Sequence, residues 1–325
     1  MDLHKFQYIF NNGKNPKYKY YIQAYWKAYF PRFILRAQLQ EKLEQARRRE
    51  DYDYILKRVE YYNKLEPGHA FDNDLWLQKA LPVGKHKKTH PSVYFFDTME
   101  HARWFPKHLR YALWPGDVTK VPQIPMIVKS RPIDGQNANS VLLNLDKVRH
   151  FVFLDDKTDF GQKLDSAIFR GGIKKNLNRW QFLEKYHGNP RVDAAATDRC
   201  KPEWEGRTLT LHEHLSHKFV LSLEGNDVAS NLKWIMSSNS IAIMPKPTFE
   251  TWFMEGTLRP GQHYIQIRPD FADLEEKMDF YITHPEEARQ IIKNANRHVQ
   301  QFKDKKREEL IALMVLDKYF KNTNP

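Results

Sequence analysis

Short apolar runs alternate with amphipathic stretches along most of the chain beyond residue 90. The runs are typical of buried strands, and the stretches between them are typical of helices. Strands that alternate with helices in this way predict a parallel, doubly wound sheet. Eight strands over this length favour two such sheets over one. The strand candidates are Ser92–Asp97, Pro125–Lys129, His150–Leu154, Ser166–Arg170, Arg191–Ala196, Lys218–Leu223, Ser240–Met244 and His263–Ile267.

Helical periodicity dominates the two ends of the chain. Pro31 is expected to end or kink a first helical region. Residues from about Phe33 to Leu65 follow as one charged helix, and Pro67-Gly68 marks a turn after it. Helices are also predicted between the strands and in the C-terminal tail, at Lys175–Tyr186, Val228–Ser237, Leu274–Ile282, Pro285–Phe302 and Lys306–Phe320.

Composition narrows the class of protein. The chain has 325 residues, of which 41% are apolar, so it can bury substantial cores and global disorder is excluded. Its single cysteine, Cys200, cannot form an intrachain disulfide or a zinc site, which favours a reducing compartment. The sequence shows no signal-peptide pattern and no apolar run of transmembrane length. We therefore expect a cytoplasmic protein that does not span a membrane.

The formal net charge of +12 predicts a polyanionic partner. Seven Lys or Arg residues, one acid and eleven aromatic residues lie between Met1 and Arg36. Rings interleaved with cations suit an anionic membrane interface and also suit stacking on RNA. The remaining interpretation is a helix whose aromatic face packs on its own domain. From the first interpretation we expect a peripheral protein at the inner membrane.

Two glycine turns stand between a predicted strand and a predicted helix. One is Gly225-Asn226-Asp227 and the other is Phe169-Arg170-Gly171-Gly172. Such turns can bind phosphate through free N–H groups and the helix dipole. Arg170 at one turn and Lys233 after the other would then form a diphosphate clamp. The alternative is two ordinary turns with surface cations.

Other phosphate and metal motifs are missing. There is no G-x-G-x-x-G and no G-x-x-x-x-G-K-[ST], so neither a dinucleotide fingerprint nor a P-loop is present. The acids of Leu154–Asp159 follow a predicted strand into a loop, where solvated carboxylates are the favoured interpretation. His212 and His214 are two residues apart, which points to different faces of a helix. No metal site is predicted.

Five segments in order carry a family resemblance. They are Pro122–Arg131, Ile168–Gly171, Asn189–Ala194, Lys218–Lys233 and the stretch from Glu250 through Phe253 to Tyr264. The region from about Pro122 to Phe302, over half of the chain, resembles glycosyltransferase family 90, which includes protein O-glucosyltransferases, capsule xylosyltransferases and lipopolysaccharide-core enzymes. The sequence of Glu224–Lys233 is most similar to the bacterial lipopolysaccharide branch of that family.

The resemblance implies a GT-B fold, in which two Rossmann-like domains face a cleft. It also implies inversion at the anomeric carbon, no metal or other cofactor, and a nucleotide-sugar donor as co-substrate, with a UDP-sugar as the first candidate. A hexose or pentose would pass to a lipopolysaccharide-core or related surface-glycan acceptor. The donor-binding positions carried over by the resemblance are Arg170, Gly171, Lys218, Gly225, Asn226, Ser230, Asn231, Lys233 and Glu250.

Two departures from the family pattern affect the catalytic residues. The O-glucosyltransferases have a catalytic aspartate directly after the arginine matched by Arg131, where this chain has Pro132. They also have an arginine where this chain has Asn231. The candidate general bases are therefore Asp134, in the loop after a strand, and Asp97, at the end of the predicted strand Ser92–Asp97.

The expected organisation has four segments. Residues 1–70 form a helical, basic and aromatic extension, and residues 71–160 an acceptor-side Rossmann-like domain. Residues 161–305 form the donor domain, and residues 306–325 a helix that packs back on the N-terminal half. The expected partners are a nucleotide sugar, a glycan or glycolipid acceptor and an anionic membrane surface, without nucleic acid. Two alternatives stay open: a basic nucleic-acid-binding protein and a catalytically inactive sugar-binding relative.

Overall fold

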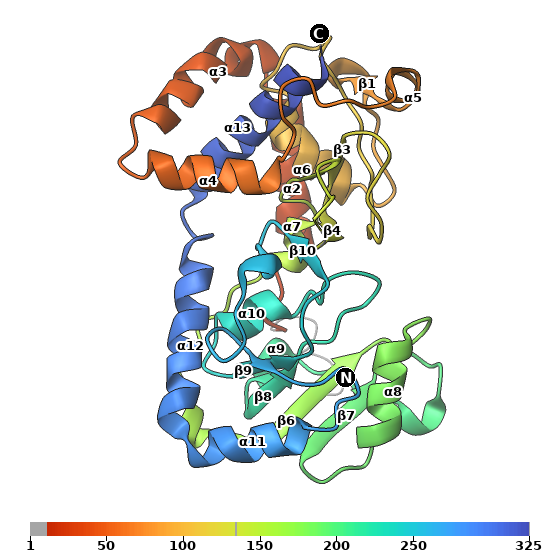
Figure 1. Ribbon diagram of the computed structural model, residues 1–325, viewed down its shortest axis with the longest axis vertical. Helices are drawn as coiled ribbons and strands as arrows, with labels where there is room; N and C mark the ends of the chain where they lie inside the picture. Colours follow the sequence, from red (N-terminus) through yellow and green to blue (C-terminus); the bar gives the residue numbers. More distant parts are fainter. Residues whose placement is uncertain (1–11, 134, 325) are drawn as a thin grey trace. The chain divides into compact units, whose positions relative to one another are not determined.

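The computed structural model describes residues 12–133 and 135–324, which form a mixed α/β protein (Figure 1). The chain divides into two compact units, each discontinuous in sequence. Unit 1 contains Arg149–Pro247, Gly256–Gln301 and the described residues up to Asn15. Unit 2 contains Pro16–Val148, Thr248–Glu255 and the chain from Phe302 onward. The predicted segments, by contrast, were continuous in sequence, and their boundaries stay predictions.

Unit 1 is built around one five-stranded parallel sheet in the order β11-β9-β8-β6-β7. All five strands were predicted from their apolar runs, because strands buried on both faces are continuously apolar. Since the strands are parallel, their carboxyl ends lie at one edge, which we call the carboxyl edge. The strands are β6 (Leu164–Gly171), β7 (Val192–Ala196), β8 (His217–Leu221), β9 (Ile241–Met244) and β11 (Ile265–Gln266).

Helices follow the strands of this sheet and pack against it. One face of the sheet, with Phe169, Phe219 and Ile243, shares a core with Phe182 of α8 and Met278 of α11. The longer helices α8, α11 and α12 agree with the predicted ranges, whereas α10 is shorter than the predicted Val228–Ser237. The helices of unit 1 are α8 (Leu177–Tyr186), α9 (Leu211–His214), α10 (Leu232–Met236), α11 (Leu274–Thr283) and α12 (Pro285–Gln300), with short 3-10 turns at Phe160–Gln162 and Pro202–Trp204.

Unit 2 is mainly helical. Its C-terminal helix α13 (Lys305–Thr323) packs against α3, α4 and α6. A break at Pro31 separates its first two described helices, as predicted. The other helices are α2 (Lys17–Tyr29), α3 (Arg32–Arg47), α4 (Tyr52–Tyr62), α5 (Asn73–Lys79) and α6 (Val93–Ala102), with the short α7 (Lys147–His150) at the border of the units and 3-10 turns at Val83–Lys85 and Glu255–Thr257.

The described strands of unit 2 form three two-stranded pairs rather than a second doubly wound sheet. Two pairs are antiparallel, and the pair β3–β5 is parallel. The sequence therefore correctly predicted one parallel sheet, and the second is not found among the described residues. The strands are β1 (Leu81–Pro82), β2 (Arg110–Tyr111), β3 (Met126–Val128), β4 (Ser130–Pro132), β5 (Ser140–Leu142) and β10 (Phe249–Thr251).

Three predicted elements are wrong. Ser92–Asp97 is not a strand but the N-cap and first half of helix α6, whose residues Val93, Tyr94 and Phe96 are all buried. A helix buried on nearly every side carries a continuous apolar run, which periodicity cannot distinguish from a strand. His150–Leu154 forms no strand, because α7 ends at His150 and an irregular segment follows. The single helix predicted for Phe33–Leu65 is two helices, α3 and α4.

Candidate active site

The N–H groups of the turn after β6 already bind a carboxylate of the protein itself, that of Asp198. The Asp198 carboxylate accepts hydrogen bonds from the N–H groups of Ile173 (2.7 Å) and Lys174 (2.9 Å). A Cβ atom on Gly172 would lie 3.0 Å from the Asp198 Oδ2 atom, so only glycine fits there without displacing the carboxylate. Although partial burial raises the pKa of Asp198, these hydrogen bonds outweigh that effect and hold it below its ordinary value. The predicted anion-binding character of this turn is real, but its N–H groups serve an internal carboxylate.

Arg179 of α8 ties the two glycine turns together. Its guanidinium donates to the carbonyl oxygen of Gly172 (3.1 Å) and to that of Leu223 (2.8 Å). These two residues follow the neighbouring strands β6 and β8. Burial lowers the pKa of Arg179, but an arginine stays charged. Its Nε atom is buried and has no hydrogen-bond partner among the described residues.

Asn176 reinforces the same connection. Its side chain accepts a hydrogen bond from the Arg179 N–H (2.9 Å) and so caps α8. It also donates to the carbonyl oxygen of Glu224 (3.3 Å). The Asn176 side chain and the Arg179 guanidinium thus connect the segments that follow β6 and β8 at the carboxyl edge. Sequence reasoning missed both residues, although an arginine early in a helix after a glycine turn was a visible signal.

Gly225 lies close to the Arg179 guanidinium. A Cβ atom at this position would lie 3.2 Å from the Arg179 Nη2 atom. The Gly225 N–H donates to the carbonyl oxygen of Asp227 (2.9 Å), which closes the turn. In the structure, the group that approaches Gly225 closely is therefore the Arg179 guanidinium. Its predicted contact with a donor phosphate stays a prediction.

Arg170, the predicted diphosphate ligand, is paired within the sheet. Its Nη2 atom donates to both carboxylate oxygens of Asp193 (2.7 and 2.9 Å) on the adjacent strand β7. Its Nη1 atom donates to the carbonyl oxygen of the same residue (2.8 Å). A diphosphate would have to replace the Asp193 carboxylate to be bound by this side chain. The neighbouring Gly171 ends β6, and a Cβ atom on it would clash with the ring of Phe169.

The structure does not bring Lys218 to the carboxyl edge. Lys218 lies at the amino end of β8 and pairs with Asp165, so it belongs to the opposite edge of the sheet. Asn231 precedes α10 and fastens it to β8, because its side chain donates to the Leu221 carbonyl oxygen (2.8 Å) and accepts from the Ser222 hydroxyl (3.0 Å).

The remaining predicted donor residues of unit 1 differ in exposure. Lys233 is completely buried within α10. Ser230 is half-buried, and Asn226 is exposed in the turn after β8. Their roles as donor ligands stay predictions, and among them only Asn226 is openly accessible to a ligand.

Glu250 belongs to unit 2, apart from the other predicted donor residues. It is buried on β10, where it pairs with Arg131 (Nε–Oε1 2.7 Å) and accepts a hydrogen bond from the hydroxyl of Tyr61. Arg131 is itself fully buried and donates to the carbonyl oxygens of Tyr61 (2.6 Å) and Ser140 (3.1 Å). These contacts give both residues a role in holding β4, β10 and α4 together.

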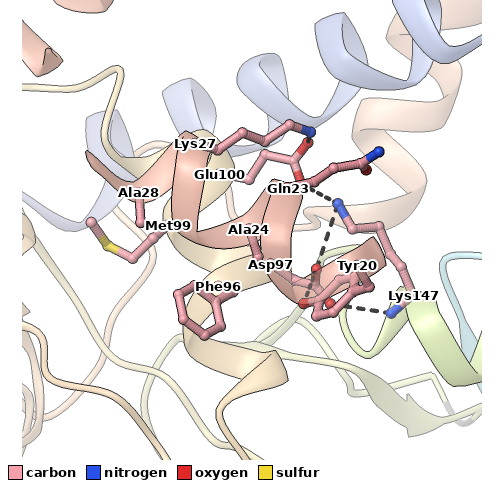
Figure 2. A pocket seen from close by; sticks show the side chains of 10 residues that line it. All are labelled: Tyr20, Gln23, Ala24, Lys27, Ala28, Phe96, Asp97, Met99, Glu100 and Lys147. Atoms are coloured by element: carbon pink, nitrogen blue, oxygen red, sulfur yellow. Dashed lines mark hydrogen bonds and ion pairs between the residues drawn. The ribbon is translucent and has the colours of Figure 1, made fainter. Parts of the chain in front are cut away.

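Asp97, one of the two candidate bases, faces a polar pocket of about 120 Å³ in unit 2 (Figure 2). Its carboxylate accepts a hydrogen bond from the Tyr20 hydroxyl (2.8 Å) and another from the Lys147 N–H (3.1 Å). The Lys147 ammonium lies 3.6 Å from the same carboxylate and also pairs with Glu100. We call this the acceptor-side pocket; its lining residues are Tyr20, Gln23, Ala24, Lys27, Ala28, Phe96, Asp97, Met99, Glu100 and Lys147.

The electrostatics of this pocket suit a proton acceptor. Burial raises the pKa of Asp97 to about 6, although the Lys147 ammonium and the Tyr20 hydroxyl act in the opposite direction. Burial also lowers the pKa of the neighbouring His101 to about 4, so that imidazole is neutral near pH 7. A carboxylate with a pKa near the working pH is an effective general base. Asp97 was predicted at the end of a strand, and that prediction is wrong, because it lies within helix α6. Its role as a general base stays a prediction.

The second candidate base, Asp134, lies outside the described residues. Its predicted role therefore stays a prediction. The neighbouring strand β4, which ends at Pro132, pairs antiparallel with β10 through Pro132↔Phe249 and Arg131↔Glu250.

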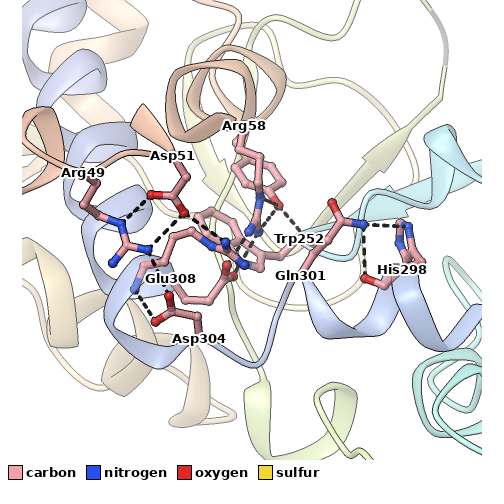
Figure 3. Close-up of polar contacts among 10 residues, drawn as sticks. Arg49, Asp51, Arg58, Trp252, His298, Gln301, Asp304 and Glu308 are labelled. Carbon is pink, nitrogen blue, oxygen red and sulfur yellow. Dashed lines mark hydrogen bonds and ion pairs between the residues drawn. The ribbon is translucent and has the colours of Figure 1, made fainter. Parts of the chain in front are cut away.

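A different buried charge in unit 2 serves packing. The Arg58 guanidinium pairs with Glu308 of α13 (Figure 3). It also lies 4.8 Å from the centre of the Phe302 ring. Its Nε atom donates to the Tyr62 hydroxyl (3.0 Å), and the indole of Trp252 donates to the same Glu308 carboxylate (2.6 Å). Every contact here fastens α4, α13 and the residues after β10 to one another, so this cluster is a structural anchor.

Within the described ranges, no group of three or more His, Cys, Asp or Glu side chains could hold a metal ion. Asp156, from the acidic loop considered above, pairs with Lys163 (2.8 Å) and accepts from the Asn239 N–H (2.9 Å). No helix of the described chain has the length and apolar character needed to cross a membrane.

An open parallel sheet with glycine turns at its carboxyl edge defines a class of α/β proteins that bind phosphorylated ligands there. The family model described as Glycosyl transferase family 90 matches residues 143–321. The chain is also 42% identical over 275 residues to O-glucosyltransferase LpsA from Dichelobacter nodosus, covering 83% of this chain and 84% of that protein.

More distant similarity extends to mammalian proteins. Protein O-glucosyltransferase 3 from Rattus norvegicus is 25% identical over 165 residues, and its counterpart from Homo sapiens is 24% identical over the same length. In both cases the match covers 48% of this chain and 32% of the relative. The chain belongs to glycosyltransferase family 90, which confirms the family predicted from the sequence. Glycosyl transfer in turn requires a sugar donor and a glycan acceptor.

Proposed function

We propose that this enzyme transfers a sugar, with glucose as the first candidate among hexoses and pentoses, from a nucleotide sugar to a hydroxyl group of a surface glycan. The observation that carries the proposal is the carboxyl edge of the parallel sheet, where Arg179 joins the turns after β6 and β8. Open α/β sheets bind nucleotides at this edge. The name of the bacterial relative, an O-glucosyltransferase, supports glucosyl transfer.

The finer assignments follow from the family resemblance. We propose UDP as the nucleotide, a lipopolysaccharide-core or related acceptor, and work at the cytoplasmic face of the inner membrane. A GT-B arrangement of two domains belongs to the same proposal. In this proposal the parallel sheet of unit 1 is the candidate donor site, and the polar pocket of unit 2 is the candidate acceptor site.

The chemistry is a single inverting displacement without a metal. The acceptor oxygen attacks the anomeric carbon while the bond from that carbon to the diphosphate oxygen breaks. The electron pair of the broken bond stays with the diphosphate, whose charge Arg179 and, after exchange of Asp193, Arg170 would stabilise. The acceptor proton passes to a carboxylate, with Asp97 as the first candidate and Asp134 as the second.

A panel of UDP-sugars, assayed for transfer and for slow donor hydrolysis, tests this function. We expect one UDP-sugar to be used, and Arg170→Ala to lower kcat/KM for it by at least tenfold. Arg191→Ala is a matched control, because Arg191 also pairs with an aspartate, Asp279, on the surface of unit 1. Full activity of Arg170→Ala would remove this side chain from the donor site.

A catalytically inactive sugar-binding relative is the second candidate. Pro132 stands where the O-glucosyltransferases have their catalytic aspartate, and this observation favours it. Binding of a UDP-sugar without turnover, across the donor panel and with several glycan acceptors, would establish this alternative. Turnover that is lost in Asp97→Asn or Asp134→Asn, with folding retained, would exclude it.

A further inference from the structure

Helix α2 exposes an apolar stripe to solvent. Tyr18, Ile22 and Trp26 recur every four residues and are 65%, 67% and 73% exposed. Residues spaced by four lie on one face of a helix. Phe33, in the first turn of α3, is also exposed, at 72%. We call these four residues the outer stripe.

A flanking face of α2 packs on α6. Tyr21 and Tyr25 contact the ring of Phe96, with ring centres 6.1 and 4.8 Å apart. A surface helix of a soluble protein ordinarily has one apolar face toward the core and a polar face toward water. Because the outer stripe lies outside this packed face and is exposed, it needs a second apolar environment.

The charges around the outer stripe are of one sign. The segment from Asn12 to Arg36 contains no Asp or Glu and six cationic residues. Lys88 reinforces this side, because its ammonium donates to the Tyr25 hydroxyl (2.9 Å) and lies 4.9 Å from the centre of that ring. Exposed rings surrounded by cations are complementary to the headgroup region of an anionic bilayer. The cationic residues are Lys14, Lys17, Lys19, Lys27, Arg32 and Arg36, of which Lys27 pairs with Glu100 at the acceptor-side pocket and is therefore not counted as a lipid contact.

We propose that the outer stripe docks on an anionic lipid bilayer, with its apolar side chains at headgroup depth and the surrounding cations on lipid phosphates. The cations make this surface a poor match for a second copy of the same chain, since two positive faces would repel each other. The helix lies on the membrane and does not cross it. The proposed docking therefore depends on one defined face of α2, rather than on the net positive charge of the whole chain.

Docking by α2 has a consequence that rests on the proposed function. The same helix supplies Tyr20, Gln23 and Lys27 to the wall of the acceptor-side pocket (Figure 2). One face of α2 would thus contact lipid while its other face frames the pocket that contains Asp97. The geometry points to a lipid-anchored acceptor, whose polar glycan reaches the pocket from the membrane surface.

Vesicle co-sedimentation of the full chain tests the docking surface. We expect wild type to bind vesicles of phosphatidylcholine with about 30% phosphatidylglycerol and to bind pure phosphatidylcholine much more weakly. Ile22→Ser/Trp26→Ser should weaken binding to the anionic vesicles by about tenfold or more. The matched control is Leu77→Ser/Phe280→Ser, which removes two exposed apolar side chains (57% and 46% exposed) from α5 and α11. It should bind as wild type does.

Equal vesicle binding by wild type and Ile22→Ser/Trp26→Ser would overturn the proposal. So would a concentration-dependent dimer that this variant abolishes, because the stripe would then be an interface between copies. Transfer assays separate this failure from that of the proposed function. The stripe variant should retain transfer to a water-soluble acceptor and lose it selectively for an acceptor embedded in vesicles. Wild type that binds vesicles but transfers no sugar would contradict the proposed function alone.

Discussion

The two candidate regions of this enzyme differ in how their charges are arranged. At the carboxyl edge of unit 1, the predicted diphosphate ligand Arg170 is already neutralised, since it pairs with Asp193. In the acceptor-side pocket of unit 2, burial instead raises the pKa of Asp97 to about 6. At the candidate donor region, the chain's own carboxylates Asp193 and Asp198 therefore occupy the anion positions. The candidate acceptor region contains Asp97, a carboxylate whose raised pKa suits the proposed role of proton acceptor.

This difference separates binding from chemistry. Substitutions at the carboxyl edge should change the affinity for the donor, because they disturb the geometry of two turns. Substitutions at Asp97 should change the rate of transfer and leave donor binding intact. The predictions below test that separation.

Asp97→Asn should have the largest effect. Asparagine keeps the size of the side chain and cannot accept the acceptor proton, so kcat should fall by about 10²- to 10⁴-fold. The KM for the nucleotide sugar should change little. Steady-state kinetics and circular dichroism on the same preparation check this outcome. A fall in kcat of less than tenfold would contradict Asp97 as the base and leave Asp134 as the candidate. Asp134→Asn should then lower kcat instead.

Arg179→Lys should mainly weaken donor binding. A lysine cannot donate to both the Gly172 and the Leu223 carbonyl oxygens with a planar fork, so the two turns lose their common anchor. We expect the KM for the nucleotide sugar to rise by about tenfold, while the KM for the acceptor stays unchanged. Lys185→Arg, on the exposed end of α8, is a control that should leave both constants unaltered. An unchanged donor KM in Arg179→Lys would separate this arginine from the donor site.

Asp198→Asn should have a smaller effect, chiefly on stability. Hydrogen bonds from Ile173 and Lys174 hold the pKa of this carboxylate below its ordinary value, so it stabilises the native state above that ordinary pKa. That contribution is lost as the pH falls through the lowered pKa. Asparagine keeps one acceptor oxygen and should cost about 1 kcal/mol near pH 7. Urea unfolding at pH 7 and near pH 3 checks this, since the difference between wild type and variant should shrink at the lower pH.

Much of unit 1 could be predicted from the sequence because its signals are local. Each strand of the parallel sheet is a continuous apolar run, and Gly172 and Gly225 mark the turns that follow two of them. The strand predicted at Ser92–Asp97 was wrong because α6 is buried along Val93, Tyr94 and Phe96, which gives the same pattern as a buried strand.

The side-chain partners could not be predicted, because they come from distant parts of the chain. Asp97 meets Tyr20 across 77 residues and the Lys147 N–H across 50 residues. Asp198 reaches the N–H of Ile173 across 25 residues. No periodicity in a single sequence encodes such pairs. The sequence could therefore predict anion-binding turns at the carboxyl edge of the sheet. It could not predict that the chain's own carboxylates are bound there.

Tyr20→Phe should give the smallest effect and the most specific one. The Tyr20 hydroxyl donates to Asp97 and so lowers the pKa of that carboxyl, together with the Lys147 ammonium and against burial and the charge of Glu100. Removing the hydroxyl should raise the pKa of Asp97 further above 6. The acidic limb of the kcat/KM profile should then move to higher pH by a fraction of a unit, while activity near pH 8 is retained.

Tyr21→Phe is the matched control for this shift. It removes a hydroxyl from the adjacent residue, for which the described structure gives ring contacts with Tyr20 and Phe96, both retained by phenylalanine, and no side-chain hydrogen bond. Its pH profile should coincide with that of wild type. A limb that stays in place in Tyr20→Phe would mean that the titrating group of the reaction is not Asp97. Asp134 would then become the candidate base, and the acceptor-side pocket would lose its proposed role in proton transfer.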